Sequence, residues 1–341
     1  MSRVSAAASR VTPAHAGIAA QPTRTLVTRV WYPADGPAAQ PPVADAPLAA
    51  GGPFPLVVNS HGFSELNVGC AYIAEALARR GFVVAAPNFP LTNGATPGGP
   101  WLPDVANQPG DVRFVLDELV RLSGTPGSWL AGGVDERRIG AQGLSLGGLT
   151  TLLVTYNPVL RDRRIRAAFT MAPVSCPLTR KLLRSSPPLV LVNGDHDLIT
   201  PLDQNAGRTF VRARMPRRLI TLAGATHTSF TGLVNGASTI NYDAALGCRA
   251  LDDVTQATFD ETLAALGAAA AGADVRGCEL PCRDPAPPGP SMTADRQHEL
   301  TRAVAVAFFQ ERLQQSRAAR CFLDKGFAAE NAEVTLRRRP R

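Results

Sequence analysis

Lysine is almost absent from this 341-residue chain, and apolar runs long enough to cross a membrane are missing. The only lysines are Lys181 and Lys325, so the formal net charge of +7 comes almost wholly from arginine. No apolar run approaches the roughly 18 residues that a membrane-spanning helix needs, so we expect no transmembrane segment. The basic charge is not accompanied by the motif of a nucleic-acid-binding fold, so we expect no nucleic-acid partner.

The most informative motif is the sequence Gly-Leu-Ser-Leu-Gly-Gly at residues 143–148. An apolar stretch at residues 138–142 predicts a strand before it, and residues 149–154 can open a buried helix after it. A G-x-S-x-G pentapeptide between a strand and a helix is the nucleophile elbow, whose tight turn exposes the serine at its apex. The pattern therefore predicts Ser145 as a nucleophile. The alternative interpretation is an ordinary glycine turn.

A serine nucleophile needs a base and an acid, which follow an elbow serine along the chain in the order acid, then histidine. Of the five histidines, only His227 ends a predicted strand, which begins at Arg218, and also lies after the acid candidates. We therefore predict His227 as the base. The acid candidates Asp195 and Asp197 both follow the buried strand that begins at Pro188. The residues leave both open, since either carboxylate could instead cap the turn.

An apolar strand at residues 55–60 leads into the sequence His61-Gly62-Phe63. In hydrolases with a nucleophile elbow, such a loop supplies one backbone amide of the oxyanion hole, and the residue after the nucleophile supplies the second. We predict that the amides of Phe63 and Leu146 hold the oxyanion, each contributing on the order of 3 kcal/mol. His61 is expected to orient this loop rather than transfer protons. The alternative is again a strand with an ordinary glycine turn.

Several of these segments occur together, and in the same order, in a known family: residues 28–34, 60–63, 111–117, 143–148 and 194–197. With them the chain resembles the platelet-activating-factor acetylhydrolase-like group of bacterial α/β-hydrolases, which is often placed beside the dienelactone hydrolases. The resemblance implies an acid three residues after a turn glycine, which favours Asp197 over Asp195. Leu144 stands where many esterases have histidine. True dienelactone hydrolases use a cysteine nucleophile, so Ser145 excludes that activity.

The succession of predicted strands and helices indicates an α/β-hydrolase fold. We expect a doubly wound, mostly parallel sheet flanked by helices, with a cysteine-containing insertion before the last helix. The periodicity of apolar residues predicts helices over residues 68–80, from Pro109 onward, and over residues 293–313, and strands at residues 82–86 and 164–171. We expect a poorly ordered arm at residues 1–24, a single domain at residues 25–330 with the insertion at residues 228–291, and a basic tail at residues 331–341.

Most of the six cysteines lie in the last hundred residues: Cys248, Cys278, Cys282 and Cys321. We expect disulfides among these four that tie the insertion and the tail together, with three pairings possible. Free thiols and a zinc site are the alternatives, and zinc is disfavoured because the sequence has no companion pair at finger spacing. The two other cysteines, Cys70 and Cys176, are expected to be small core or loop residues.

Disulfides imply an oxidising compartment, so we expect a secreted or periplasmic protein, although residues 1–23 lack the apolar core of a signal peptide. A cytoplasmic protein with reduced cysteines is the alternative. The motifs together predict a serine carboxylester hydrolase that needs no cofactor or metal. Its expected substrates are short-to-medium acyl esters, small or polymeric, of lipid, phospholipid acetyl or polyester type. An amidase or peptidase with the same triad and a catalytically silent binding module are the other hypotheses.

Overall fold

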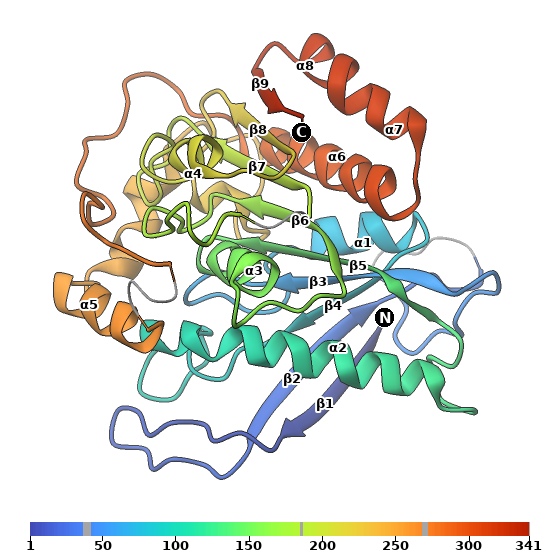
Figure 1. The fold of residues 1–341 in the computed structure, drawn as a ribbon. Coiled ribbons are helices and arrows are strands. Elements are labelled where there is room, and N and C mark those ends of the chain that lie inside the picture. Colours follow the sequence, from blue (N-terminus) through green and yellow to red (C-terminus); the bar gives the residue numbers. More distant parts are fainter. Residues whose placement is uncertain (37–41, 185–186, 268–271, 341) are drawn as a thin grey trace.

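The computed structural model describes residues 1–36, 42–184, 187–267 and 272–340, and within them nine strands form one mostly parallel sheet (Figure 1). The strand order is β1-β2-β4-β3-β5-β6-β7-β8-β9, and only the pairs β1–β2, β2–β4 and β8–β9 are antiparallel. The strands are β1 (Ser2–Ala8), β2 (Arg24–Trp31), β3 (Phe54–Ser60), β4 (Val83–Pro87), β5 (Val134–Leu144), β6 (Ile165–Met171), β7 (Leu189–Gly194), β8 (Arg217–Leu222) and β9 (Val334–Arg339). This arrangement confirms the predicted α/β-hydrolase fold.

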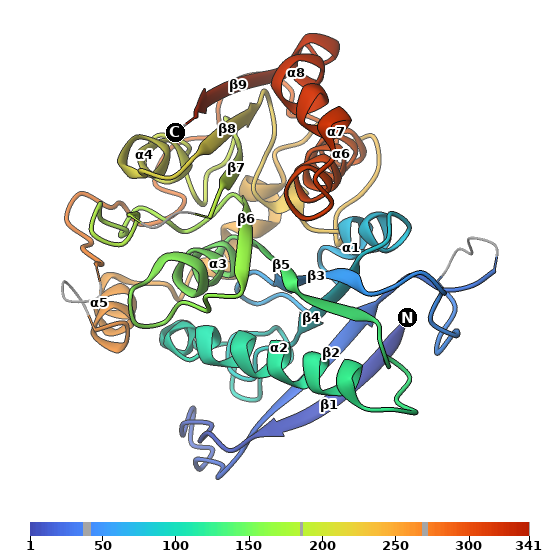
Figure 2. The same ribbon diagram turned by 45° about the vertical axis from the view of Figure 1, so that its right-hand side comes forward.

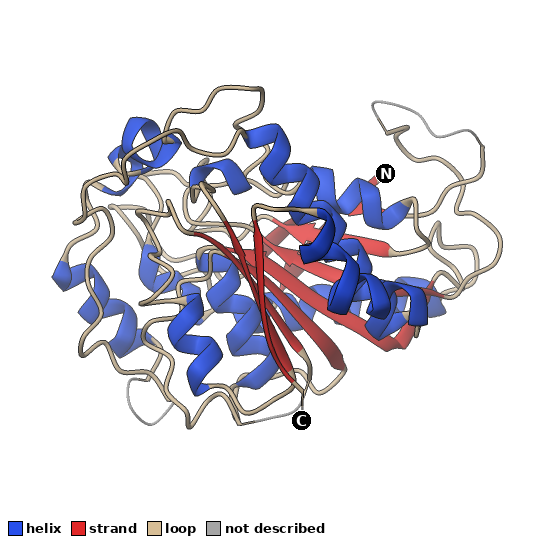
Figure 3. Cartoon of the chain, turned by 90° about the horizontal axis from the view of Figure 1, so that it is seen from above, coloured by secondary structure: helices blue, strands red, loops and turns tan. Residues whose placement is uncertain are grey.

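Helices cover both faces of the twisted sheet, which is seen edge-on in Figure 3. α1 and α6 pack on one face, and α2, α3 and α4 pack on the other. The α-helices are α1 (Ala71–Ala78), α2 (Gln108–Gly124), α3 (Leu146–Tyr156), α4 (Ala206–Arg212), α5 (Gln256–Ala265), α6 (Ala294–Leu313), α7 (Arg317–Cys321) and α8 (Phe327–Glu330). The shorter turns are η1 (Leu102–Ala106), η2 (Thr228–Phe230), η3 (Asp243–Gly247), η4 (Arg249–Leu251) and η6 (Phe322–Gly326). None of the described helices has the length and apolar character needed to span a bilayer.

The central strands are buried on both faces, which explains their nearly continuous apolar sequences. β3, β4 and β7, for example, are buried along almost their whole length. The chain crosses from β4 over β3 to β5, so the strand order reverses at β3. In open α/β sheets, ligands bind beyond the carboxyl ends of the strands at such a reversal. The loops after β3 and β5 therefore lie at the expected position of the site.

The two ends of the chain form the edge strands, β1 and β9, where the sequence predicted an arm and a tail. β1 pairs along its whole length with β2, and β9 pairs along its whole length with β8 (Figure 2). The expectation of a poorly ordered arm is therefore wrong for residues 2–8, and residues 334–339 of the basic tail are a strand. Edge strands are held mainly by main-chain hydrogen bonds to one neighbour, so a weak apolar pattern is sufficient. Arg341 of the predicted tail lies outside the described residues.

The insertion at residues 228–291 is held by two disulfides that differ from the expected set. Cys278 pairs with Cys176, and Cys248 pairs with Cys282, whereas Cys321 is an exposed free thiol. The expected tie to the tail is therefore wrong, and so is the expectation that the bridges join only the last four cysteines. Cys176 is a buried loop residue, as expected, but it takes part in a bridge. Cys176 lies in the loop after β6, 102 residues before its partner, and only the folded sheet brings this loop beside the insertion. Residues 268–271 of the insertion lie outside the described residues.

Candidate active site

Ser145 occupies a sharp turn between β5 and α3. Its φ is +56° and its ψ is −117°, a conformation that non-glycine residues rarely adopt. A Cβ atom at Gly143 would lie 2.1 Å from the carbonyl oxygen of Gly147, and one at Gly147 would lie 2.0 Å from that of Ser60. Only glycine fits at both positions. The turn therefore has the geometry of a nucleophile elbow, with Ser145 at its apex and at the N-terminus of α3.

His227 directly follows the loop after β8, and Asp197 lies in the loop after β7. The Nδ1 atom of His227 lies 3.0 Å from Oδ2 of Asp197 and 3.0 Å from Oγ1 of Thr200. The Thr200 hydroxyl also donates to Oδ2 of Asp197 over 2.9 Å. All three side chains are buried. The pair thus has the arrangement in which a carboxylate fixes the orientation and tautomer of an imidazole.

Asp195, the other acid candidate, lies elsewhere. Its side chain is exposed, and its Oδ1 accepts a hydrogen bond from the backbone N–H of Gly224 over 2.6 Å. The neighbouring His196 has its Nδ1 atom 3.4 Å from the hydroxyl of Ser291. Asp195 therefore caps the turn after β8, and of the two candidates the structure places Asp197 against His227.

Asp243 is a buried carboxylate in the insertion, and sequence reasoning missed it. Its side chain accepts hydrogen bonds from three backbone N–H groups: Leu198 at 3.0 Å, His227 at 2.9 Å and Thr228 at 2.6 Å. It therefore ties the loop that carries Asp197 to the turn that carries His227. Nothing in the sequence around it, Asn-Tyr-Asp-Ala, forms a recognisable motif. Only the three-dimensional contacts show its role.

The pKa of His227 is set by two opposing effects. Burial lowers this pKa, but the nearby negative charge of Asp197 and its hydrogen bond outweigh the burial and raise it above the ordinary value. The carboxylates of Asp243 and Glu65 also raise the pKa. Since a general base works best near the ambient pH, the raised pKa keeps His227 basic enough to accept a proton.

The loop after β3 lies directly against Ser145. A Cβ atom at Gly62 would lie 3.5 Å from the Cβ of Ser145, so the loop approaches the serine closely. The Gly62 N–H donates to Oε2 of Glu65 over 2.8 Å, and this bond holds the His61–Gly62 peptide, one peptide before the amide of Phe63. Oε1 of Glu65 is buried without a hydrogen-bond partner among the described residues, and burial raises the pKa of this carboxyl to about 7. Sequence reasoning also missed Glu65.

His61 is completely enclosed, and its two ring nitrogens have different partners. Its Nε2 accepts the backbone N–H of Phe89 over 3.0 Å, so Nδ1 carries the proton and donates to the carbonyl of Gly62 over 2.7 Å. Both contacts require the neutral ring. Burial lowers the pKa of His61 to about 4, which agrees with that state. His61 therefore joins the loop after β3 to the loop after β4 through its two hydrogen bonds.

A cavity of about 80 Å³ opens beside Ser145. Phe63 and Leu146, the predicted sources of the oxyanion amides, both line it, so these two residues lie on the same side of the site as the serine. No group of three or more His, Cys, Asp or Glu side chains in the described ranges is placed to hold a metal ion.

Comparison with known proteins places the chain in a family. The family model described as "PET hydrolase-like" matches residues 44–256, which is more than half of the chain. The chain belongs to the PET hydrolase-like family. No curated protein matches the sequence. The solved structure of a ferulic acid esterase from Streptomyces cinnamoneus is similar over 98% of this chain and 95% of its own, with a TM-score of 0.63 and 24% identity.

Together, family and fold make this PET hydrolase-like chain a carboxylic ester hydrolase with the α/β-hydrolase fold. The family match includes Ser145, Asp197 and His227 but ends at residue 256, where α5 begins. α5, Cys278 and Cys282 therefore lie beyond the matched segment.

Proposed function

We propose that this ester hydrolase uses Ser145 as nucleophile, His227 as general base and Asp197 as the acid that orients His227. The observation that carries the proposal is the strained Ser145 at the end of β5, combined with the buried contact between Asp197 and His227 beyond β7 and β8. The positive φ at a non-glycine residue is costly and persists where surrounding structure enforces it. Here Gly143 and Gly147 are that structure.

The reaction takes place in two displacements. Nε2 of His227 removes the proton of the Ser145 hydroxyl while Oγ attacks the ester carbonyl carbon, and the backbone N–H groups of Phe63 and Leu146 hold the resulting oxyanion. The tetrahedral intermediate collapses, His227 protonates the leaving alcohol, and an acyl-serine remains. Water then attacks the acyl-serine with His227 again as base, and His227 passes the proton of this water to Oγ of Ser145 as the carboxylic acid leaves. Throughout, Asp197 stabilises the imidazolium without taking its proton.

The proposed substrates are carboxylic esters with short-to-medium acyl groups, since the cavity beside Ser145 is small and mainly apolar. We further propose that the protein works outside the reducing cytoplasm. Two disulfides in the described residues support this location, because disulfides persist in oxidising compartments.

Replacement of Ser145 by Ala tests the proposed chemistry. We expect kcat for p-nitrophenyl acetate and butyrate to fall by at least about 10³-fold, because the remaining groups supply only binding and oxyanion stabilisation. Wild-type enzyme should show a burst of p-nitrophenol, the kinetic mark of an acyl-enzyme. A panel that includes the matching p-nitroanilides separates an esterase from an amidase.

Matched variants test the two other assignments. Asp197→Ala should lower kcat by about 10⁴-fold, whereas Asp195→Ala should stay within a few-fold of wild type. His227→Ala should be inactive and His196→Ala active. Full activity in Ser145→Ala, or an equal loss in the two aspartate variants, would refute the assignments.

A further inference from the structure

The cavity beside Ser145 has two walls of different origin. The α/β core provides one wall, which contains Phe63, Leu146 and Leu149. The insertion provides the opposite wall, from Leu251 through α5 to Pro281. α5 packs against η1, which lies just before α2, so the insertion reaches across the end of the sheet (Figure 1). The insertion thus forms a cap over the serine, and we call residues 251–266 the cap segment.

The side chains that the cap segment presents to the cavity are apolar except for Thr262, whose hydroxyl donates to the carbonyl of Thr258. Phe259 and Leu263 from α5 are half-buried, and Leu266 at its end is buried. The outer face of the same helix is charged, with Asp260 and Glu261 exposed. The cap segment brings no charged group to the cavity, and Glu279 farther along the insertion lines it but accepts a hydrogen bond from Gln204 over 2.8 Å. Such a wall favours an uncharged hydrocarbon group as the occupant.

The cavity is small for an aliphatic ligand. Its volume is about 80 Å³. An apolar protein cavity of about 150 Å³ accepts a benzene ring, so roughly half of that volume suits a chain of only a few carbons. A longer chain would have to displace the cap segment.

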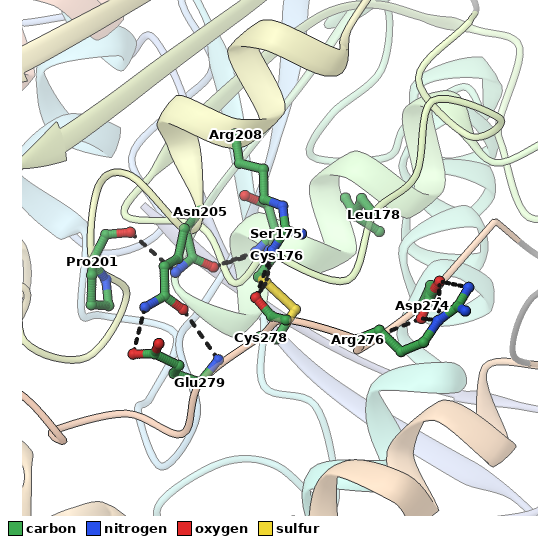
Figure 4. Close-up of a disulfide and its surroundings, with 12 residues drawn as sticks. Ser175, Cys176, Leu178, Pro201, Asn205, Arg208, Asp274, Arg276, Cys278 and Glu279 are labelled. Carbon is green, nitrogen blue, oxygen red and sulfur yellow. Dashed lines mark hydrogen bonds and ion pairs between the residues drawn. A yellow bond between two sulfur atoms is a disulfide. The ribbon is translucent and has the colours of Figure 1, made fainter.

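The insertion that carries the cap segment is fastened to the core, as Figure 4 shows for one of its ties. The Cys176–Cys278 disulfide joins the loop after β6 to the insertion, and Arg208 on α4 donates to the carbonyl of Gly277 over 2.8 Å. Asn205 accepts the backbone N–H groups of Ser175 and Cys176, each at 3.0 Å, so the core end of the bridge is itself fixed (Figure 4). The wall therefore resists the displacement that a larger ligand would need.

The position of His227 decides which half of the ester enters the cavity. His227 must protonate the leaving alcohol, so the alcohol oxygen faces this histidine in the reacting complex. Ser145 lines the cavity, whereas His227 is not among the residues that line it. The acyl group is therefore the half that points into the cavity, and the alcohol points away from it.

On these grounds we infer that the capped cavity is an acyl pocket that confines this enzyme to small esters of short aliphatic acids and excludes long acyl chains and polyesters. The inference rests on the proposed serine chemistry. It also assigns a specificity role to the cap segment, most of which lies beyond the family match.

An acyl-chain series tests the pocket. With p-nitrophenyl esters, we expect wild-type kcat/KM to fall at least tenfold from butyrate to octanoate and no soluble product to appear from a polyester film. Phe259→Ala and Leu263→Ala should each raise the octanoate-to-butyrate ratio of kcat/KM at least fivefold, because each shortens a side chain of the apolar wall and so enlarges the cavity. Glu261→Ala, on the exposed face of the same helix, is the control and should leave the ratio unchanged. A series of alkyl acetates should show no comparable dependence on alcohol length.

The outcomes separate failure of the pocket from failure of the chemistry. In Ser145→Ala, thermal shifts with ethyl butyrate and ethyl octanoate report binding without turnover, and only the butyrate should stabilise the protein. Two results would overturn the assignment of the cavity as an acyl pocket. One is an octanoate-to-butyrate ratio that Phe259→Ala and Leu263→Ala leave unchanged, and the other is efficient hydrolysis of octanoate or polyester by the wild type. Inactivity toward every ester, with the thermal shifts still selective for butyrate, would overturn the chemistry and retain the pocket.

Discussion

Three carboxylates from different parts of the chain act on His227. Asp197, in the loop after β7, contacts the Nδ1 atom of His227, and Asp243, in the insertion, accepts a hydrogen bond from the backbone N–H of His227. Glu65, in the loop after β3, acts on His227 through its charge alone. Each negative charge favours the imidazolium and so raises the pKa of His227, and Glu65 does so only where its own carboxyl, with a pKa of about 7, is ionised. Activity requires the neutral base, so the rate should fall as the pH drops through this raised pKa.

Glu65→Gln tests this balance. The glutamine retains an oxygen that can accept the Gly62 N–H but carries no charge, so the pKa of His227 should decrease. The acid limb of kcat/KM for p-nitrophenyl acetate should therefore move to lower pH, by less than about one pH unit. A profile measured from pH 5 to 9 reads this shift directly.

The exposed Glu261→Gln provides the control for a change of charge far from His227 and should leave the profile in place. An acid limb that stays at the wild-type pH in Glu65→Gln, or moves upward, would contradict an electrostatic contribution of Glu65.

Sequence reasoning located the residues that belong to a local pattern. The glycines around Ser145 make the elbow recognisable, because the turn sterically requires them. Asp197 could be favoured over Asp195 only through a family resemblance, and the structure places Asp197 beside His227. Asp243 and Glu65 carry no such pattern. Asp243 acts through backbone amides of segments elsewhere in the chain, and Glu65, which binds the nearby Gly62 N–H, lies near His227 only in the folded protein.

At the scale of elements, apolar runs and glycine stops predicted the central strands and main helices with small shifts at their ends. The strand predicted at residues 82–86 is β4 at Val83–Pro87, and the helix predicted at residues 293–313 is α6 at Ala294–Leu313. The pairing of Cys176 with Cys278 could not be predicted in this way, because the α/β topology, not the spacing in the sequence, brings these two cysteines together.

The Cys176–Cys278 bridge fastens an element that adds little core of its own. Cross-linking residues 102 positions apart restricts the unfolded chain strongly, so the double variant Cys176→Ser/Cys278→Ser should lose about 2–5 kcal/mol of unfolding free energy. The loosened cap segment should also accept longer acyl groups, which raises the octanoate-to-butyrate ratio. Urea unfolding and the acyl series measure the two effects.

Thiol counting accompanies this experiment. Denatured wild type should expose two reactive thiols without reductant and six after reduction, because Cys70 and Cys321 are free. Cys321→Ser, which removes an exposed thiol, should leave stability and selectivity unchanged. Six thiols in unreduced protein, or an unaltered stability of the double variant, would show that the bridge does not form.

At the scale of the whole molecule, a buried ionic cluster joins β2, in the N-terminal half of the sheet, to α2 and to η1, the turn against which α5 packs. Arg24 on β2 is fully buried and contacts Asp104 on η1 and Asp111 on α2, with its Nε 2.8 Å from Oδ1 of Asp111. Arg10 adds a further contact to Asp111. Since η1 packs against α5, the cluster links β2 to the cap segment through a chain of packed elements.

Arg24→Leu should therefore destabilise the protein more than loss of any exposed ion pair. It leaves the buried Asp104 without a guanidinium and the buried Asp111 with only the contact from Arg10, and breaking a buried ion pair typically costs about 3–5 kcal/mol. The reference is Arg137→Leu, whose side chain is 85% exposed beside Asp135, where a surface pair contributes at most about 1 kcal/mol. Urea unfolding at pH 7 should separate the two variants clearly, and equal midpoints would mean that the buried cluster contributes no more than a surface pair. Because Ser145 and His227 follow other strands, β5 and β8, kcat for p-nitrophenyl acetate in folded Arg24→Leu should remain within a few-fold of wild type. Selectivity against octanoate should weaken, because η1 loses its contact with Arg24.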